Sequence, residues 1–388
     1  MIPREASPTA LRLAQGFPVV VITGPRQSGK TTLARAAFAH RPYVTLEDPE
    51  ERAFAAADPR GFLARFPDGA VVDEAQHCPE LFSYLQGVVD ARPAAGRFVL
   101  TGSQQFGLLS RITQSLAGRA GLVQLLPFST RELGGAGRLP ASLDQLLWQG
   151  GYPPLYDRPL HPADWFANYV ATYLERDVRQ LLAVKDLGLF QRFVKLCAAR
   201  TGQLLNLSAL GADCGIAHVT AREWLTVLEA SYLVALLPPY HRNFGKRVVK
   251  SPKLYFLDAG LAAYLLGIRD PASLGIHAQR GALFETLVVS ELVKRRFHAG
   301  RPADLYFWRD SAGHEVDLLF EGEGGRLQAV EVKSGATFVP EWAGAAKKWQ
   351  GLAGDEAAPP WLVYGGDESY TRQGIRVFSW RNLAELPG

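Results

Sequence analysis

The sequence has 388 residues, of which 47% are hydrophobic and 21% charged, so we expect roughly two to four folded domains rather than a disordered chain. Its 42 basic and 38 acidic residues give a net charge of +4, too small to imply a polyanionic partner from charge alone. No stretch reaches the roughly 18 uncharged apolar residues of a membrane span, which predicts no membrane association. Three widely spaced cysteines form neither a metal set nor a disulfide framework and favour the cytoplasm: Cys78, Cys197 and Cys214.

The first predicted element is a buried strand over residues 19–23, because neither of its faces carries a polar residue before Thr23. The following turn reads GPRQSGKT over residues 24–31 and matches G-x-x-x-x-G-K-S/T at every fixed position. The backbone N–H groups of such a turn surround phosphate oxygens, and the helix beginning at Lys30 adds about half a positive charge. We expect Lys30 to reach the β and γ phosphates and Thr31 to reach Mg²⁺. The strand-turn-helix context disfavours a glycine-rich turn with an unrelated lysine.

A second apolar strand, residues 70–74 (AVVDE), ends in two carboxylates. This is the layout of a Walker B strand. Asp73 at the strand end could hold Mg²⁺, usually through water, while Glu74 could polarise the water that attacks the γ-phosphate. An exposed acidic strand end is the alternative interpretation, and it accounts better for one carboxylate than for two.

A third short strand, residues 97–104, also ends in polar residues, and Ser103 or Gln104 could sense the γ-phosphate. A plain loop after a strand would give the same pattern. The predicted nucleotide-binding residues are therefore Gly24, Arg26, Gln27, Ser28, Gly29, Lys30, Thr31, Thr32 and Ser103.

A helix-like stretch over residues 106–116 precedes Arg119 and the strand-like residues 122–126. In an oligomeric ATPase, an arginine at this point stabilises the transition state on the γ-phosphate of the neighbouring subunit. Arg119 acting in this way would make a monomer nearly inactive. The alternative is a helix-terminal arginine that complements the helix dipole.

With these motifs the chain resembles the AAA+ class, in particular the bacterial and archaeal ATPases with a carboxyl-terminal domain of the DUF4143 type. The resemblance extends over nearly the whole chain, through GPRQSGKTT (24–32), LEDPEERAFAAADPRGFL (46–63), VVDEAQ (71–76), LTGSQ (100–104), SLAGRA (115–120), GGYPP (150–154), YLERDVR (173–179) and SPKLYFLDAGLAAYLLG (251–267). It implies an ATP- and Mg²⁺-dependent hydrolase.

The middle of the chain is rich in aromatic residues and leucine up to about Val184, which predicts the helical lid of the ATPase. Arg176 and Arg179 share one helical face and would either reach the nucleotide or form ion pairs. The pattern after residue 190 is typical of a winged helix-turn-helix, with a capping box at residues 220–223 starting the recognition helix. That helix offers few basic groups. A basic wing between Tyr240 and Lys253 suits nucleic-acid phosphates better, with a solvated turn as the alternative; its basic residues are Arg242, Lys246, Arg247, Lys250 and Lys253.

Near the carboxyl end, an apolar helix over about residues 281–296 contains Glu285, and two strands over residues 314–320 and 327–333 form a hairpin. If the hairpin is centred on Gly324, Asp317 lies opposite Glu331 with Cβ atoms about 4.5 to 5.5 Å apart. Two opposed carboxylates favour a divalent cation. The alternative is a structural hairpin in which Glu315 faces Lys333.

Lys333 shares the strand face of Glu331, and the resulting D…E-x-K pattern resembles the restriction-endonuclease-like fold. The resemblance implies that Glu285, Asp317 and Glu331 bind Mg²⁺ or Mn²⁺ and that Lys333 assists phosphodiester cleavage. The cluster is also compatible with an inactive nuclease-like domain that binds DNA or protein.

The predicted architecture is α/β, with four parts. An AAA+ P-loop core with a parallel sheet (1–138) is followed by a helical lid (139–185), a winged helix-turn-helix (186–260) and an α/β restriction-endonuclease-like domain (261–388). We expect a cytoplasmic, homo-oligomeric ATPase that acts on nucleic acid, DNA rather than RNA. The alternative to this function is a nucleotide-dependent switch whose nuclease-like domain is inactive and serves as a binding module.

Overall fold

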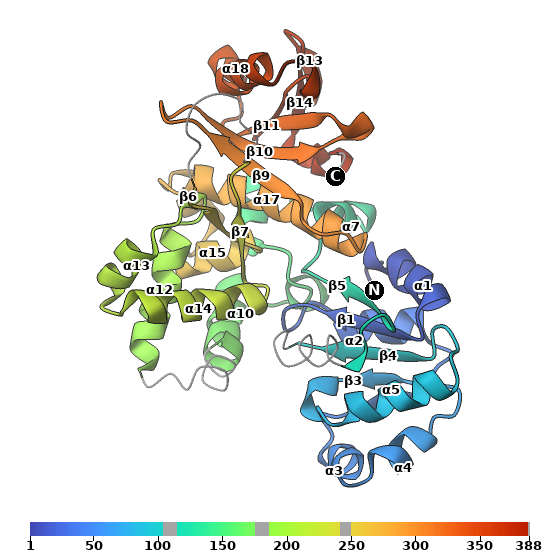
Figure 1. The fold of residues 1–388 in the computed structure, drawn as a ribbon. Coiled ribbons are helices and arrows are strands. Elements are labelled where there is room, and N and C mark those ends of the chain that lie inside the picture. The colour runs from blue at the N-terminus through green and yellow to red at the C-terminus, as the bar shows by residue number, and fades with distance from the viewer. Residues whose placement is uncertain (104–114, 175–185, 241–249, 387–388) are drawn as a thin grey trace. The chain divides into compact units, whose positions relative to one another are not determined.

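The computed structural model describes residues 1–103, 115–174, 186–240 and 250–386. These residues form two compact units, coloured along the chain in Figure 1. The first contains Met1–Phe128 and two short later segments, Ala230–Tyr232 and Lys294–Pro302. The second contains the rest. No helix in the described part of the chain is both long enough and apolar enough to span a bilayer.

The first unit is built on a five-stranded parallel sheet in the order β2-β3-β4-β1-β5. Its strands are β1 (Val19–Thr23), β2 (Tyr43–Thr45), β3 (Val71–Asp73), β4 (Phe98–Gly102) and β5 (Ala120–Gln124). β1 has the predicted bounds, whereas β5 begins two residues before the predicted strand. All of β1 and β3 is buried, which explains why both strands are continuous apolar runs rather than alternating ones.

Helices cover both faces of this sheet, because successive side chains of each strand point to opposite sides. Val19 and Val21 join a core with α3, α4 and α5, whereas Val20 and Ile22 join a core with α1 and α2. The helices are α1 (Ala6–Gly16), α2 (Lys30–Ala37), α3 (Pro49–Ala57), α4 (Pro59–Ala64) and α5 (Leu81–Ala91). The polar residues at the strand ends therefore meet at one edge of the sheet.

The second unit begins with helices and a small three-stranded sheet. The helices are α7 (Thr130–Gly135), α8 (Leu143–Gln149), α9 (Pro154–Asp157), α10 (Pro162–Tyr169), a π-helical stretch (Val170–Leu174), α12 (Leu187–Ala199), α13 (Leu207–Cys214), α14 (His218–Ala230), α15 (Ala259–Leu265) and α16 (Pro271–Gly275). Asp258 caps α15 through Leu261 N (2.9 Å) and also accepts from Gly151 N (2.8 Å). One carboxylate thus ties the GGYPP segment to the LYFLDAG segment.

The small sheet has the order β6-β8-β7, with β6 (Gln203–Leu204), β7 (Val234–Leu237) and β8 (Lys253–Phe256) all antiparallel. Together with α13 and α14 it forms the helix-turn-helix and strand pair that the sequence predicted. The backbone continues from β7 onto the next sheet, where Tyr240 N donates to Phe307 O (2.7 Å) and Phe307 N donates to Pro238 O (3.1 Å). The small sheet is therefore fixed to strand β9 (Leu305–Arg309).

The second helix of the helix-turn-helix begins earlier than predicted, so the capping box at residues 220–223 is wrong. Gly215 ends α13 in the left-handed region at φ 82°, and α14 already begins at His218. Ala221 N donates to Ala217 O (2.9 Å), which places Thr220 inside the first turn. Because Gly215 reverses the chain, only two residues lie between it and the first residue of α14.

Some predictions concern residues outside the described part of the chain. These are most of the helix over residues 106–116, together with Gln104, Arg176, Arg179, Arg242, Lys246 and Arg247.

The carboxyl-terminal part of the second unit is a mixed six-stranded sheet in the order β13-β14-β12-β11-β10-β9. Its further strands are β10 (Glu315–Glu321), β11 (Leu327–Lys333), β12 (Trp361–Tyr364), β13 (Tyr370–Arg372) and β14 (Ile375–Ser379). Helices α17 (Arg280–His298) and α18 (Gly344–Ala353) complete it. Trp349 of α18 packs in a core with Trp308 and Leu319 from the sheet.

The β10–β11 hairpin has the predicted register. Leu318 pairs with Val330 and Glu321 with Leu327, and Gly324 in the turn adopts a positive φ of 72°. This register is centred on Gly324 and leaves Asp317 and Glu331 at the open end of the ladder. The local turn chemistry was sufficient to place the two carboxylates on neighbouring strands.

Candidate nucleotide-binding and carboxylate sites

The turn between β1 and α2 has a backbone that only a glycine-rich segment adopts without strain. Gly24 and Gly29 have φ values of 149° and 94°, and Gln27 is also positive at 59°. A Cβ atom added to Gly24 would lie 2.0 Å from Leu125 O. Gly24 is therefore required for close packing of the turn against the segment after β5, while Gly29 precedes the first turn of α2.

Lys30 lies at the start of α2 with its amine turned back over the loop. Nζ donates to Pro25 O (2.7 Å) and Gly24 O (3.1 Å). A phosphate oxygen bound in a loop of this sequence pattern would accept from the lysine amine, because the backbone N–H groups of such loops surround the same phosphates.

Asp73 is the polar centre of the adjacent strand end and is 5% exposed. Thr31 Oγ1 donates to both of its carboxylate oxygens (2.9 and 3.1 Å), Tyr43 OH donates to Oδ2 (2.8 Å), and Thr101 Oγ1 donates to Oδ1. A threonine hydroxyl beside a carboxylate is an all-oxygen donor set, which fits Mg²⁺. Thr31 and Asp73 are the residues that would hold the ion, and it would neutralise charge on the nucleotide phosphates.

Glu74 follows Asp73 with a left-handed backbone, φ 51° and ψ 43°. A non-glycine residue in this region costs of order 1–3 kcal/mol and requires support from its surroundings. Glu74 N donates to Thr101 Oγ1 (3.3 Å), and Glu74 Oε2 accepts from Gln76 and from Ser103 Oγ (3.4 Å). The structure thus brings Glu74 and Ser103 together at the ends of two adjacent strands, where a γ-phosphate sensor and a water-orienting carboxylate would be needed.

The other predicted nucleotide contacts lie in the same turn and helix. Arg26 and Gln27 are half-buried, and Thr32 is exposed in the first turn of α2. The Ser28 hydroxyl is buried and has no hydrogen-bond partner among the residues that the structure describes. An unsatisfied buried hydroxyl inside a phosphate-binding loop is available to a ligand oxygen.

Arg119 lies just before β5 and is engaged within its own chain. Its Nε donates to Asp90 Oδ1 (2.6 Å) and Nη2 to Asp90 Oδ2 (2.8 Å), while 33% of the arginine side chain remains exposed. This bidentate pair lowers the pKa of Asp90 below its ordinary value. For Arg119 to reach a neighbouring subunit, this surface pair would have to open, and a pair at such exposure costs little to break.

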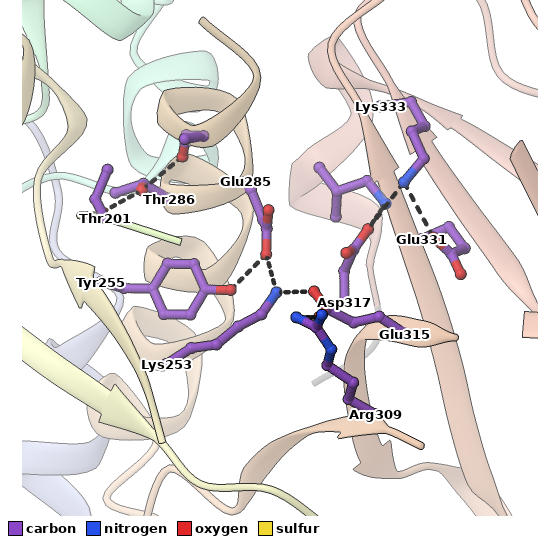
Figure 2. A network of polar contacts seen from close by, with 12 residues as sticks. Thr201, Lys253, Tyr255, Glu285, Thr286, Arg309, Glu315, Asp317, Glu331 and Lys333 are labelled. Atoms are coloured by element: carbon purple, nitrogen blue, oxygen red, sulfur yellow. Dashed lines mark hydrogen bonds and ion pairs between the residues drawn. The ribbon is translucent and has the colours of Figure 1, made fainter. Parts of the chain in front are cut away.

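The nuclease-like carboxylates lie in the second unit and divide into two groups (Figure 2). In the first group, Asp317 Oδ2 accepts from Val332 N (2.8 Å) and from Lys333 Nζ (3.3 Å), and Lys333 also pairs with Glu331 (3.1 Å). Asp317, Glu331 and Lys333 are therefore together, as predicted from the hairpin. One oxygen of Glu331, Oε1, is buried without a hydrogen-bond partner in the described part of the chain.

The second group is centred on Lys253, which the sequence assigned to an exposed wing. That assignment is wrong: Lys253 is 2% exposed, and its amine pairs with Glu285 Oε1 (3.0 Å) and with Glu315. Tyr255 OH also donates to Glu285. β8 is the central strand of its sheet, so Lys253 points into the molecule rather than out from a hairpin tip.

Glu315 likewise has partners other than the predicted one. It pairs with Lys253 and with Arg309 Nη1 (3.1 Å), whereas Lys333 pairs with Asp317 and Glu331. Arg309 lies directly opposite Glu315 on β9. The alternative of a Glu315–Lys333 pair across the hairpin is thus wrong: Lys253 and Arg309 take up the carboxylate of Glu315, and the β10–β11 ladder extends only to Leu318 and Val330.

The three predicted metal ligands of this cluster do not share one coordination sphere. Among the described residues, the carboxylate oxygens of Glu285, Asp317 and Glu331 do not all lie within 4.8 Å of one another. Ligand oxygens around one Mg²⁺ ion, each about 2.1 Å from it, lie about 3 to 4 Å apart. Asp317 and Glu331 instead share the Lys333 amine as their cation, one Glu331 oxygen stays unsatisfied among the described residues, and Glu285 does not join them.

Burial sets the protonation of these groups. It raises the pKa of Glu331 to about 9 and that of Glu285 to about 7, with the Asp317 charge adding to both shifts. Burial alone lowers the pKa of Lys253, but Glu285, Asp317 and Glu315 together raise it above its ordinary value. Lys253 is therefore a cation at neutral pH.

Sequence reasoning missed three residues of the two sites. Tyr43 and Thr101 hold Asp73, and Lys253 holds Glu285. Thr101 belongs to a predicted strand next to that of Asp73, a signal that the strand pattern contained, whereas Tyr43 begins β2, a strand that the sequence analysis did not predict. Lys253 had no such signal, since its partners come 32 residues and more later in the chain.

Comparison with known proteins divides the chain into three consecutive matches. Residues 16–134 match the AAA domain, residues 140–272 a domain of unknown function (DUF8612), and residues 280–383 a domain of unknown function (DUF4143). The uncharacterized proteins Rv2008c of Mycobacterium tuberculosis and Mb2031c of Mycobacterium bovis are each 35% identical to the chain over 338 residues, covering 86% of this chain and 74% of theirs. The chain belongs to this AAA–DUF4143 family. It contains a P-loop AAA-type ATPase fold, followed by a mixed-sheet DUF4143 domain.

Solved structures give more distant likenesses. The Walker-type ATPase PABY2304 of Pyrococcus abyssi is 16% identical, with a TM-score of 0.47, over 68% of this chain and 96% of its own. The RuvB Holliday junction branch migration motor of Thermotoga maritima is 19% identical, with a TM-score of 0.30, over 61% and 90%. AMPPCP-bound DnaA from Aquifex aeolicus is 15% identical, with a TM-score of 0.29, over 58% and 85%. The family matches and the sheet order, rather than these likenesses, identify the chain as an AAA–DUF4143 protein.

Proposed function

We propose that this AAA–DUF4143 protein is a Mg²⁺-dependent ATP hydrolase that acts on nucleic acid as a homo-oligomer. The observation that carries the ATPase part is the edge of the parallel sheet where Lys30, Thr31 and Asp73 converge. Lys30 supplies the phosphate cation, Thr31 and Asp73 the oxygen ligands for Mg²⁺, and Glu74 the carboxylate that orients the attacking water.

Nucleic acid is the proposed partner, DNA rather than RNA. Support comes from the helix-turn-helix of α13 and α14 followed by the β7–β8 pair, an arrangement that recurs in DNA-binding domains. The exposed basic residues available on the described part of this region are Arg222 on α14 and Lys250 before β8. Contacts to phosphates rather than base edges are therefore the proposed mode of binding.

Oligomerisation is proposed from Arg119. It ends the segment before β5, and its guanidinium is partly exposed. An arginine supplied by a neighbour would stabilise charge on the transferred phosphoryl group and is worth about 10³ to 10⁵ in turnover.

The DUF4143 domain is proposed to engage nucleic acid through Asp317, Glu331 and Lys333, with cleavage assisted by Mg²⁺ or Mn²⁺. A second candidate is a nucleotide-dependent switch whose DUF4143 domain binds DNA or protein without cutting it. The separation of Glu285 from Asp317 and Glu331 favours this second candidate for the conformation described.

One assay tests both. Purified protein is incubated with ATP, Mg²⁺ or Mn²⁺ and a panel of single- and double-stranded DNA and RNA, and phosphate release and strand scission are measured together. Turnover that DNA stimulates is the expected result; turnover indifferent to every nucleic acid would contradict the proposed partner. Scission lost in Asp317→Ala and Glu331→Ala selects the nuclease, and intact turnover without scission selects the switch.

A further inference from the structure

The amine of Lys253 occupies the interior of the carboxylate cluster, although this residue is no part of the D…E-x-K pattern. It comes from β8, in the region that matches DUF8612, whereas the acids come from α17, β10 and β11 in the DUF4143 region. Its ion pairs join Glu285 on α17 to Glu315 on β10, and Figure 2 shows the amine between these two carboxylates. The described site therefore contains a cation of its own.

Backbone hydrogen bonds fix the position of Lys253. β8 pairs with β7 along its whole length, from Lys253 opposite Leu237 to Phe256 opposite Val234. The chain leaving β7 is in turn bonded to β9 at Phe307, on both sides of Pro239. The strand that delivers Lys253 is thus tied to the sheet that carries Glu315 and Asp317.

The balance of charges in the cluster also disfavours a divalent ion. Four carboxyl groups, Glu285, Glu315, Asp317 and Glu331, face three cations, Lys253, Lys333 and Arg309. The cluster then holds at most one net negative charge, which attracts a divalent ion weakly once the cost of dehydrating that ion is included. Without Lys253 the cluster could hold one more net negative charge.

We propose that Lys253 is the resident cation of this cluster, which holds Glu285 away from Asp317 and Glu331 and excludes a divalent metal from a shared three-carboxylate site. Metal-dependent cleavage is therefore blocked while β8 keeps its place. The inference rests on the second candidate function, in which the DUF4143 domain binds without cutting, and is independent of ATP hydrolysis by the P-loop.

The test is Mn²⁺ binding to the full chain without nucleotide, measured by electron paramagnetic resonance of free Mn²⁺. Wild type is expected to have no Mn²⁺ site that Asp317→Asn removes. Lys253→Met is expected to gain one Mn²⁺ per chain, and adding Asp317→Asn to it is expected to remove that ion again. The control, Lys195→Met at an exposed lysine of α12, is expected to behave as wild type. An Asp317-dependent site in wild type, or a folded Lys253→Met protein without the gain, would overturn the proposal.

A measurement on the unaltered protein covers the case in which Lys253→Met does not fold. An amine-reactive acylating reagent followed by mass spectrometry is expected to modify Lys250 and to leave Lys253 unmodified, both with and without excess Mn²⁺. Modification of Lys253 when Mn²⁺ is added would mean that the metal displaces the lysine, which contradicts the proposal. ATP turnover enters neither readout, so failure of the proposed ATPase would be seen separately.

Discussion

The ion pairs of Lys253 should make a large contribution to the stability of the second unit. Its side chain is 3% exposed, and its partners Glu285 and Glu315 are 16% and 23% exposed. Removing one partner of a buried pair costs about 3–5 kcal/mol because it leaves an uncompensated charge. Here Glu285 keeps the Tyr255 hydroxyl and Glu315 keeps Arg309, so we expect Lys253→Met to cost the lower figure, about 3 kcal/mol.

Urea unfolding followed by tryptophan fluorescence measures this cost in the right part of the molecule. All eight tryptophans, Trp148 to Trp380, belong to the second unit, so the signal reports on that unit alone. Lys250→Met is the control and should change stability by no more than about 0.5 kcal/mol.

A double-mutant cycle separates the ion pair from lost packing. Glu285→Gln combined with Lys253→Met should recover at least about 1 kcal/mol relative to additive effects, because the interaction between the two residues is lost only once in the double variant. Additive effects of the two substitutions, or a cost of Lys253→Met no larger than that of the control, would refute the view that Lys253 is a buried, charged partner of Glu285.

Three further predictions concern other residues. Glu74→Gln should bind ATP normally but release phosphate at least about a hundredfold more slowly, since the water loses its orienting carboxylate; unchanged turnover would assign that role elsewhere. Arg119→Ala should lose most turnover and regain it when mixed with a Lys30→Ala protein that still offers the arginine; no recovery on mixing would rule out action in trans. Burial raises the pKa of Glu229 above 4.5, so the folded state retains its proton more firmly and the stability associated with this group falls as the pH rises through the raised value. Glu229→Gln should therefore be more stable than wild type at pH 7, with the difference vanishing below pH 4.5 in urea unfolding; a difference independent of pH would contradict this.

The first unit was predictable because its signals are local. The apolar run of β1, the glycines of the following turn and the acidic end of β3 each specify their own conformation, and parallel strands bring their ends to one edge. The β10–β11 register was predictable for the same reason, because Gly324 fixes the centre of the turn. Neither inference needed a contact between distant parts of the chain.

Lys253 was not predictable, because its environment is made by residues distant in sequence. A run of basic residues without an acid between Tyr240 and Lys253 is typical of an exposed wing, and only the later Glu285 and Glu315 give its last lysine buried partners. The start of α14 was missed for a related reason. Thr220 and Glu223 have the spacing of a capping box whether or not a helix begins there. The observed first residue of α14 depends instead on how tightly Gly215 turns the chain.

Binding and turnover of ATP by Lys30→Ala test the central claim most directly. Titration with a fluorescent ATP analogue in the presence of Mg²⁺, together with phosphate release, should show saturable binding and turnover in wild type and in Lys195→Ala, a control at an exposed lysine of α12. Lys30→Ala should lose both, because the turn after β1 would lose its phosphate cation. Wild-type affinity and turnover in Lys30→Ala would contradict the assignment of this turn as the nucleotide site.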